Sequence, residues 1–171
     1  MVQIKKADIT HTKLLSKLST ASFLVPHGHS ASKKDVDSYV AKSFSEETFA
    51  KELENASNKY YIIYYKDEVA GFSKGVFNSE NKDIKATNVM LMSRLYLLEE
   101  YYGFGLGKAL FDFNVSLAKQ DKQAGIWLVV WTENARAIDF YKKRGFKKVG
   151  DYDFKISETH SNPNHVLYLA F

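Results

Sequence analysis

Three glycines in the middle of the chain have the spacing of a loop that holds a phosphate. Gly103, Gly105 and Gly107 lie between an apolar run, residues 89–98, and a segment of helical periodicity, residues 107–119. Glycine allows a tight turn with converging backbone N–H groups, and the first turn of a helix adds unpaired donors and the positive end of its dipole. We therefore expect a phosphate or pyrophosphate to bind where this strand passes into this helix.

The two best-known phosphate-binding patterns do not fit this loop. The dinucleotide pattern G-x-G-x-x-G needs a third glycine where the chain has Lys108 or Leu110, and the P-loop pattern needs glycine where it has Tyr102. What remains is a strand, an x-x-x-G-x-G turn and a helix. A glycine-rich connection without a ligand stays open as the alternative, because glycines also serve turns and caps.

The composition indicates one compact domain, residues 1–171. The chain is 45% hydrophobic and 15% aromatic, and it contains no cysteine, which excludes disulfides, thiolate metal sites and a cysteine nucleophile. No apolar run approaches the ~20 residues of a membrane span, and the N-terminus has no apolar signal core. We expect a soluble, cytoplasmic protein without a metal. The net charge of +4 comes from lysines interleaved with acids, so we expect no nucleic-acid partner and no membrane contact.

The first half of the chain predicts helices followed by a hairpin. Asp8 can cap a helix that continues to about Phe23, and Ser45 can cap another that continues to Leu53. The remaining expected elements are a strand at 2–5, a loop at 24–32 broken by Pro26 and Gly28, a helix at 33–44, strands at 60–65 and 69–77, and a polar loop at 78–88.

The second half predicts an interior strand beside the glycine loop. Residues 126–131 are uniformly apolar, so we expect them to pair next to the strand at 89–98, which reads as buried on both faces. A helix at 135–143 should follow, and two strands at 146–156 and 165–171 should close the chain around Asn162-Pro163-Asn164. This order of elements predicts a mixed α/β sheet.

Two motifs in this order resemble the GNAT-type N-acetyltransferases. The loop motif of that superfamily falls on residues 102–107, and its Asn-x-x-Ala-x-x-Phe-Tyr-x-x-x-Gly-Phe motif falls on residues 134–146 without a mismatch. The stretches 44–53 and 60–71 look most like the PaiA-type bacterial spermidine/spermine acetyltransferases. One departure is Tyr102, where the family usually has Gln or Arg. The resemblance implies a mostly antiparallel central sheet with splayed central strands, flanked by helices.

The resemblance also implies an acetyl-CoA site. The pantetheine arm would lie where residues 89–98 and 126–131 splay apart, and Asn134 would bond to it, although that side chain can equally serve as a helix cap. Lys143 would reach the ribose phosphate, with a solvated helix end as the alternative. The expected cofactor contacts are Leu95, Tyr96, Leu97, Tyr102, Gly103, Phe104, Gly105, Leu106, Gly107, Lys108, Asn134, Tyr141 and Lys143.

Tyr141 is the expected catalytic residue, because the family's tyrosine at this motif position faces the sulfur and protonates or hydrogen-bonds the departing thiolate. A core aromatic beside Phe140 is the alternative. A thiol of pKa ~8.5 and a phenol of pKa ~10 differ little enough for a hydrogen bond in a dry cleft to offset. The attacking amine, of pKa ~10.4, must lose a proton. The family often places a Glu on the central strand, but this chain has Leu91 and Ser93 there. His27, His29 and a water relay remain the candidates.

The resemblance implies direct attack by a primary amine on acetyl-CoA in a ternary complex, with a polyamine such as spermidine or spermine as the expected acceptor. Negative charge should then surround the amine pocket, and the nearest acids are Asp35, Asp37, Glu46 and Glu47. A protein lysine or N-terminal acetyltransferase stays open, since Tyr39, Tyr60 and Tyr61 could line a peptide groove instead. A non-catalytic acyl-CoA-binding domain and a homodimer are also left open.

Overall fold

The computed structural model describes all residues, 1–171, and contains one seven-stranded sheet. Its strands follow the order β1-β2-β3-β4-β5-β7-β6, and every neighbouring pair is antiparallel except β4 and β5. This confirms the expected mixed, mostly antiparallel sheet. The strands are β1 (Val2–Lys6), β2 (Asn58–Tyr65), β3 (Glu68–Val76), β4 (Met90–Leu97), β5 (Gly125–Trp131), β6 (Lys147–Lys155) and β7 (Ser161–Ala170).

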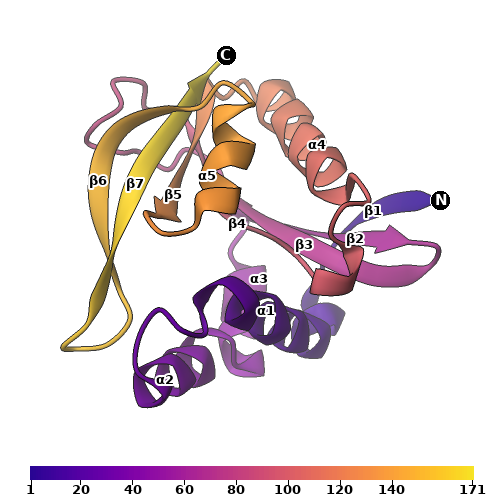
Figure 1. Ribbon diagram of the computed structural model, residues 1–171. Helices are drawn as coiled ribbons and strands as arrows, with labels where there is room; N and C mark the ends of the chain where they lie inside the picture. The colour runs from indigo at the N-terminus through magenta and orange to yellow at the C-terminus, as the bar shows by residue number, and fades with distance from the viewer.

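Helices cover both faces of the sheet (Figure 1). Helices α1 and α3 pack against β2, β3 and β4, with α2 farther from the sheet, and α4 lies on the opposite face of the same strands. None of the helices is long and apolar enough to cross a membrane. The helices are α1 (Thr12–His27), α2 (Lys33–Ser43), α3 (Glu46–Glu54), α4 (Leu106–Gln120) and α5 (Ala135–Lys142), with short 3-10 turns at Ile9–His11 and Glu99–Tyr101.

The core has a separate layer on each side of the sheet because side chains alternate along the strands. On β2, Tyr60 and Ile62 pack with α1 and α3, while Ile63 packs with Leu106 and Leu110 of α4. A third cluster joins α4 and α5 to β4, β5 and β7 through Met90, Met92, Phe111, Ile126, Leu128, Tyr141 and Phe146. Both central strands are thus held on one face by α4 and α5.

The central strands β4 and β5 separate after two residue pairs. The two strands pair only through Met90 with Ile126 and Leu91 with Trp127. Beyond them the register of β4 against β3 shifts, so that Ser93 is left between the paired residues on either side. Such a β-bulge bends its strand and increases the twist. The bulge therefore accompanies the point where β4 leaves β5 and a gap opens in the sheet.

Two expectations about β4 and α1 were wrong. β4 is not buried on both faces, because beyond Met92 its residues border the gap and are exposed or half-buried. Helix α1 continues to His27 through Pro26, which we expected to break it. Pro26 lies in the last turn, where only one backbone bond is lost. The stacking of His27 on Phe23, with ring centroids 4.8 Å apart, holds this turn in helical conformation.

The expected turn at residues 162–164 was also wrong. These residues belong to β7, and the chain reverses earlier, between Lys155 and Ser161. Pro163 is tolerated in the strand because β5 ends opposite Asn164. Proline is accepted in a sheet where its missing N–H faces no neighbouring strand. Its carbonyl still accepts a hydrogen bond from the Thr132 N–H at 3.0 Å.

Candidate functional site

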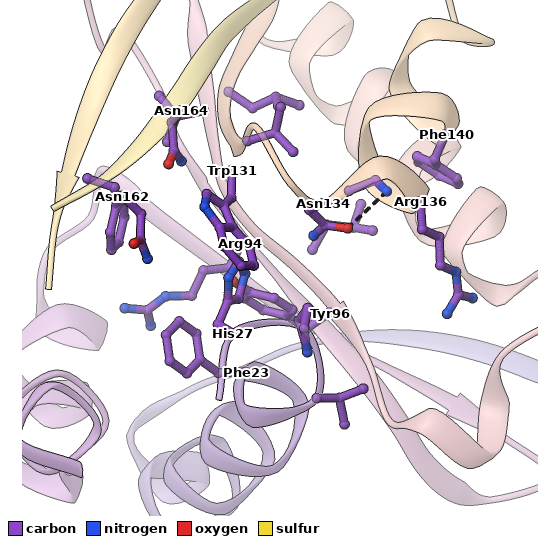
Figure 2. A pocket seen from close by; sticks show the side chains of 18 of the residues that line it. Phe23, His27, Arg94, Tyr96, Trp131, Asn134, Arg136, Phe140, Asn162 and Asn164 are labelled. Atoms are coloured by element: carbon purple, nitrogen blue, oxygen red, sulfur yellow. Dashed lines mark hydrogen bonds between the residues drawn. The ribbon is translucent and has the colours of Figure 1, made fainter. Parts of the chain in front are cut away.

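A cavity of about 650 Å³ opens where β4 and β5 diverge. Its walls come from the two splayed strands, the end of α1, α2, the start of α5 and the β6–β7 hairpin. Most of the lining residues are apolar or aromatic, with a few polar groups among them. Figure 2 shows them converging from elements far apart in the sequence. A concave, mostly apolar pocket of this kind is the usual setting of a ligand site.

The glycine loop lies at one end of this cavity. Gly103 and Gly105 have φ of +85° and +75°, in the left-handed region that glycine adopts without strain. Gly105 is the N-cap of α4, and its carbonyl accepts the first helical bond from Ala109. The N–H groups of Leu106, Gly107 and Lys108 consequently have no partner within the helix, and they offer donors to an anion.

Tyr102 makes a cation–π contact with Arg136. The Arg136 guanidinium lies 3.7 Å from the centroid of the Tyr102 ring, and both residues line the cavity. Arg136 stands in the first turn of α5, where a cation is unfavourable to the helix dipole. The sequence reasoning missed Arg136, although a basic residue at a helix N-terminus was an available signal. The glycine loop therefore has a cation beside it, supplied by another element.

The polar groups along the cavity come from α5 and from the edge of β4. The Asn134 side-chain oxygen accepts from the Ala137 N–H at 3.2 Å, the bond drawn in Figure 2. It is a helix cap that also lines the cavity. On β4, the Leu98 N–H donates to Ala70 of β3. Because backbone groups alternate along a strand, those of Leu95 and Leu97 face the gap, whereas those of Tyr96 face β3.

Tyr141 lines the cavity from α5, close to the rings of Phe140 and Phe146. Burial is the main cause that raises the pKa of its phenol above the usual value, and Tyr96 adds to the shift. The hydroxyl therefore stays protonated at neutral pH and is available to donate a proton or a hydrogen bond. Burial likewise raises the pKa of Tyr96 to about 12.

Six expected contacts do not line the cavity: the loop residues Gly103, Phe104, Gly105, Leu106 and Lys108, and Lys143 at the end of α5. Phe104 is 55% exposed at the tip of the glycine loop. The Lys108 ammonium pairs with Asp112 at 2.5 Å, and the Lys143 ammonium pairs with Asp139 at 2.7 Å, both at the surface. These ion pairs are weak because they are exposed to solvent. Either lysine can leave its partner for a phosphate without a large loss.

Both histidines of the α1 end reach the cavity. His27 and His29 lie near the Trp131 ring, with centroids 5.8 Å and 5.5 Å away. Burial, with a smaller contribution from His29, lowers the pKa of His27 to about 4. An imidazole of that pKa is a poor acceptor for a proton from an alkylammonium of pKa ~10.4. His27 is thus a neutral wall residue.

The expected acidic surround of the cavity is absent. Asp35, Asp37, Glu46 and Glu47 do not line it, and two of them form exposed ion pairs on their own helices. The helices present these carboxylates to solvent because their apolar sides pack into the hydrophobic core. Glu133, beside Asn134, is the only acid among the lining residues.

Of the three tyrosines expected to border an acceptor groove, Tyr39 alone lines the cavity. Tyr60 is buried under α3, where its hydroxyl donates to Glu52. Tyr61 lies on the other face of β2, with its ring 4.7 Å from that of Phe113. Alternation along β2 turns Tyr61 to the face away from the cavity, and burial under α3 keeps Tyr60 out of it.

Comparison with known proteins identifies the family of this chain. A model of the acetyltransferase (GNAT) family matches residues 27–146. The chain is 26% identical over 159 residues to the uncharacterized N-acetyltransferase in the pepI 3′ region of Lactobacillus delbrueckii subsp. lactis, covering 92% of this chain and 90% of that protein. It is 33% identical over 108 residues to the spermine/spermidine N(1)-acetyltransferase of Bacillus subtilis strain 168, covering 60% and 70%.

The fold is also found among solved structures. The PaiA N-acetyltransferase of Thermoplasma acidophilum, solved in complex with coenzyme A, superposes with a TM-score of 0.79 at 19% identity, covering 100% of this chain and 99% of that one. At this identity the likeness concerns the fold alone. Because the family model spans more than half of the sequence, this chain belongs to the acetyltransferase (GNAT) family and is an N-acetyltransferase, a type of acyltransferase.

Proposed function

We propose that this enzyme transfers the acetyl group of acetyl-CoA to the primary amine of a small molecule in the cavity between β4 and β5. The observation that carries the proposal is the opening of the sheet directly beside the glycine loop. The PaiA enzyme of similar fold was solved with coenzyme A. A long cofactor with a pyrophosphate at one end and a thioester at the other fits a cavity with anion donors at one end.

Each part of acetyl-CoA has a matching set of groups. The N–H groups of the loop from Gly103 to Lys108, together with Arg136, bind the pyrophosphate, because helix N-termini and guanidinium groups favour anions. Backbone groups of Leu95 and Leu97 pair with the amides of the pantetheine arm. The Asn134 amide bonds to the same arm, and Lys143 is available for the ribose phosphate.

The transfer is a direct displacement. The neutral amine nitrogen attacks the thioester carbonyl, a C–N bond forms and the C–S bond breaks. The Tyr141 hydroxyl donates to the departing thiolate, and the proton lost from the amine passes to water. Because burial raises the pKa of Tyr141, full proton transfer costs more than the ~1.5 units between a free phenol and a free thiol suggest. A strong hydrogen bond therefore accounts for its assistance better than complete protonation.

Polyamines remain one candidate class of acceptor. Their support is the spermine/spermidine N(1)-acetyltransferase of Bacillus subtilis, which is similar to 60% of this chain. The cavity offers a polycation only Glu133, on the cofactor side near Asn134. Neutralising Asp35, Asp37, Glu46 and Glu47 should consequently leave acetylation kinetics unchanged, as measured by thiol release with spermine.

Thiol release from acetyl-CoA with a panel of amines tests the proposed function. The panel contains polyamines, amino acids, aminoglycosides and peptides with a free N-terminus or lysine. We expect turnover with small amines, and a thermal shift with acetyl-CoA but not with NAD or ATP, because a ligand stabilises the folded state to which it binds. Turnover of peptides alone would support a protein acetyltransferase. Binding of acetyl-CoA without any turnover would indicate a non-catalytic domain.

A further inference from the structure

The end of the cavity opposite the glycine loop contains a fixed arginine. Arg94 lies next to the bulged residue of β4 and lines the cavity. Its guanidinium lies 4.9 Å from the centroid of the Phe44 ring and 5.6 Å from that of Phe49. In Figure 2 the side chains of Arg94 and Arg136 extend to opposite sides of the view. Arg94 is therefore a second cation, held by aromatic contacts away from the phosphate end.

The charge of Arg94 is only partly compensated by the protein, because its nearest carboxylate, Glu52, is shared with Lys74. An Arg94 N–H donates to the Tyr60 hydroxyl at 3.3 Å, and Tyr60 in turn donates to Glu52. Glu52 forms its ion pair with Lys74, at 2.9 Å, and the side chains of these two residues are only 23% and 12% exposed. None of the ion pairs in the structure includes Arg94. One carboxylate thus serves two cations, and this cluster has a surplus positive charge.

The other groups at this end are neutral. Aromatic rings of Phe23, Tyr39, Phe44 and Phe154 line it, and the β7 side chains Asn162 and Asn164 add two nearly buried carboxamides. A half-buried guanidinium among aromatic rings that has no carboxylate of its own favours a ligand that supplies an anion, because burying a charge is costly unless it is paired. The same guanidinium opposes a second ammonium group.

We propose that the acceptor is an amino acid or a close analogue: a primary amine that carries a carboxylate, bound by Arg94, and an apolar group, packed on the aromatic rings. Guanidinium groups bind carboxylates through two parallel N–H···O bonds, so Arg94 orients the acceptor as well as attracting it. This inference rests on the proposed acetyl transfer and specifies its acceptor. It differs from the polyamine reading in the sign of the charge that the acceptor presents to Arg94.

Matched acceptors that differ only in the carboxylate test this inference in the wild-type enzyme. Phenylalanine is compared with phenethylamine, leucine with isoamylamine, and both pairs with spermidine, by thiol release at saturating acetyl-CoA. We expect kcat/KM for each amino acid to exceed that of its amine by on the order of 10²-fold, the range for a buried, hydrogen-bonded charge pair. Equal use of the two members of each pair, or preference for spermidine, would overturn the inference.

The variants Arg94→Gln and Arg94→Lys identify the group responsible. Arg94→Gln should remove the preference for the amino acids, chiefly through KM, and leave the simple amines unaffected or improved. Arg94→Lys should restore part of the preference, because it keeps the charge but loses the paired bonds. Lys42→Gln, which removes a positive charge from the exposed surface of α2, is the control and should behave like wild type. If Arg94→Gln lowers the use of all acceptors equally, Arg94 has only a structural role.

Two further outcomes separate this inference from the proposed function. If Arg94→Gln does not fold, as shown by the absence of a cooperative thermal transition, the inference is decided by the acceptor preferences of wild type and Arg94→Lys. Turnover of spermidine without turnover of any amino acid would overturn the inference and leave acetyl transfer intact. Absence of acetyl-CoA binding, and of thiol release with every amine, would overturn the proposed function itself.

Discussion

At the scale of single residues, the Tyr141 phenol is the group on which the chemistry of the transfer depends most. Tyr141→Phe keeps the ring that packs with Phe146 and removes only the hydroxyl. We predict that kcat falls by ~10² to 10⁴, the range for a lost acid–base group, while the affinity for acetyl-CoA changes by only a few-fold. Steady-state kinetics and calorimetric titration of acetyl-CoA measure the two effects.

The control for this variant is Tyr168→Phe. Tyr168 is a tyrosine of β7 outside the cavity lining, so its hydroxyl should have no effect on turnover. Equal kcat for Tyr141→Phe and wild type would contradict the role of Tyr141 as a proton donor. A loss of acetyl-CoA affinity as large as the loss of turnover would make Tyr141 a cofactor contact.

Arg136 should bind the pyrophosphate. It would supply the polar contact that the usual Gln or Arg of the loop gives in the family, because this chain has Tyr102 at that position. We predict that Arg136→Gln weakens the binding of CoA and of dephospho-CoA by about the same factor, ~10-fold for one charged hydrogen bond. Lys143→Gln should weaken the binding of CoA alone, since dephospho-CoA has no ribose phosphate. Titration calorimetry with both ligands distinguishes the two residues. Lys142→Gln is the control, because Lys142 is exposed and outside the cavity.

His27 should make stability depend on pH. Burial lowers its pKa from 6.5 to about 4 in the folded state, so the unfolded chain binds more protons between these values. The contribution of neutral His27 to the free energy of unfolding is complete above pH 6.5. It is lost as the pH falls through 4, which lowers the free energy of unfolding by up to ~3 kcal/mol. His27→Phe keeps a ring against Phe23 and should flatten that decline. Urea unfolding from pH 7 to 4 measures it, and an unchanged slope would contradict the assignment.

At the scale of elements, acetyl-CoA binding by the glycine loop should depend on two separate properties, the backbone conformation of the loop and its charge. Gly105 has φ of +75°, and no atom lies within 4 Å of where a Cβ would be. Asparagine tolerates this left-handed conformation better than most residues. Gly105→Asn should therefore fold and retain part of the acetyl-CoA binding. Gly105→Asp should lose the thermal shift with acetyl-CoA, because its carboxylate repels the pyrophosphate.

The comparison of these two near-isosteric variants isolates charge from shape. Both should show a similar drop in Tm without ligand, since the strain is the same. Normal acetyl-CoA binding by Gly105→Asp would contradict the position of the pyrophosphate at this loop.

Elements were predictable wherever a local signal determined them. Ser45 caps α3 as expected, through the Thr48 N–H at 3.1 Å, and Gly145 ends the chain's last helix with φ of +90°. Proline misled the prediction at Pro26 and at Pro163. In both places tertiary contacts determine whether the missing N–H costs a hydrogen bond. That information is not present in the local sequence.

At the scale of the whole molecule, the topology of the fold brings the residues of the site together. The two motifs meet at one cavity, where Tyr102, Gly107 and Tyr141 are among the lining residues, because their spacing follows the strand-loop-helix order. Arg94 and Arg136 were missed as functional residues, although a single charge within an apolar strand was visible in the sequence. Their roles depend on which elements face the gap, and the bulge at Ser93 that accompanies the gap has no sequence signature of its own.

The acceptor end was the least predictable part for the same reason. It is assembled from α1, α2, β4 and the β6–β7 hairpin, which are remote in sequence. The acids expected at this end lie on the solvent side of α2 and α3, whereas Glu52 is half-buried and forms an ion pair with Lys74. Proximity in the sequence therefore does not show which charged side chains face the pocket.

The most direct test of this account is the detection of the acetylated product. Acetyl-CoA labelled with ¹³C in the acetyl group is incubated with the enzyme and an amine, and mass spectrometry follows the label. We predict one labelled N-acetyl group for each thiol released, with far slower transfer by Tyr141→Phe and none by Gly105→Asp. Thiol release without a labelled amide, or equal transfer by all three proteins, would contradict acetyl transfer at the gap between β4 and β5.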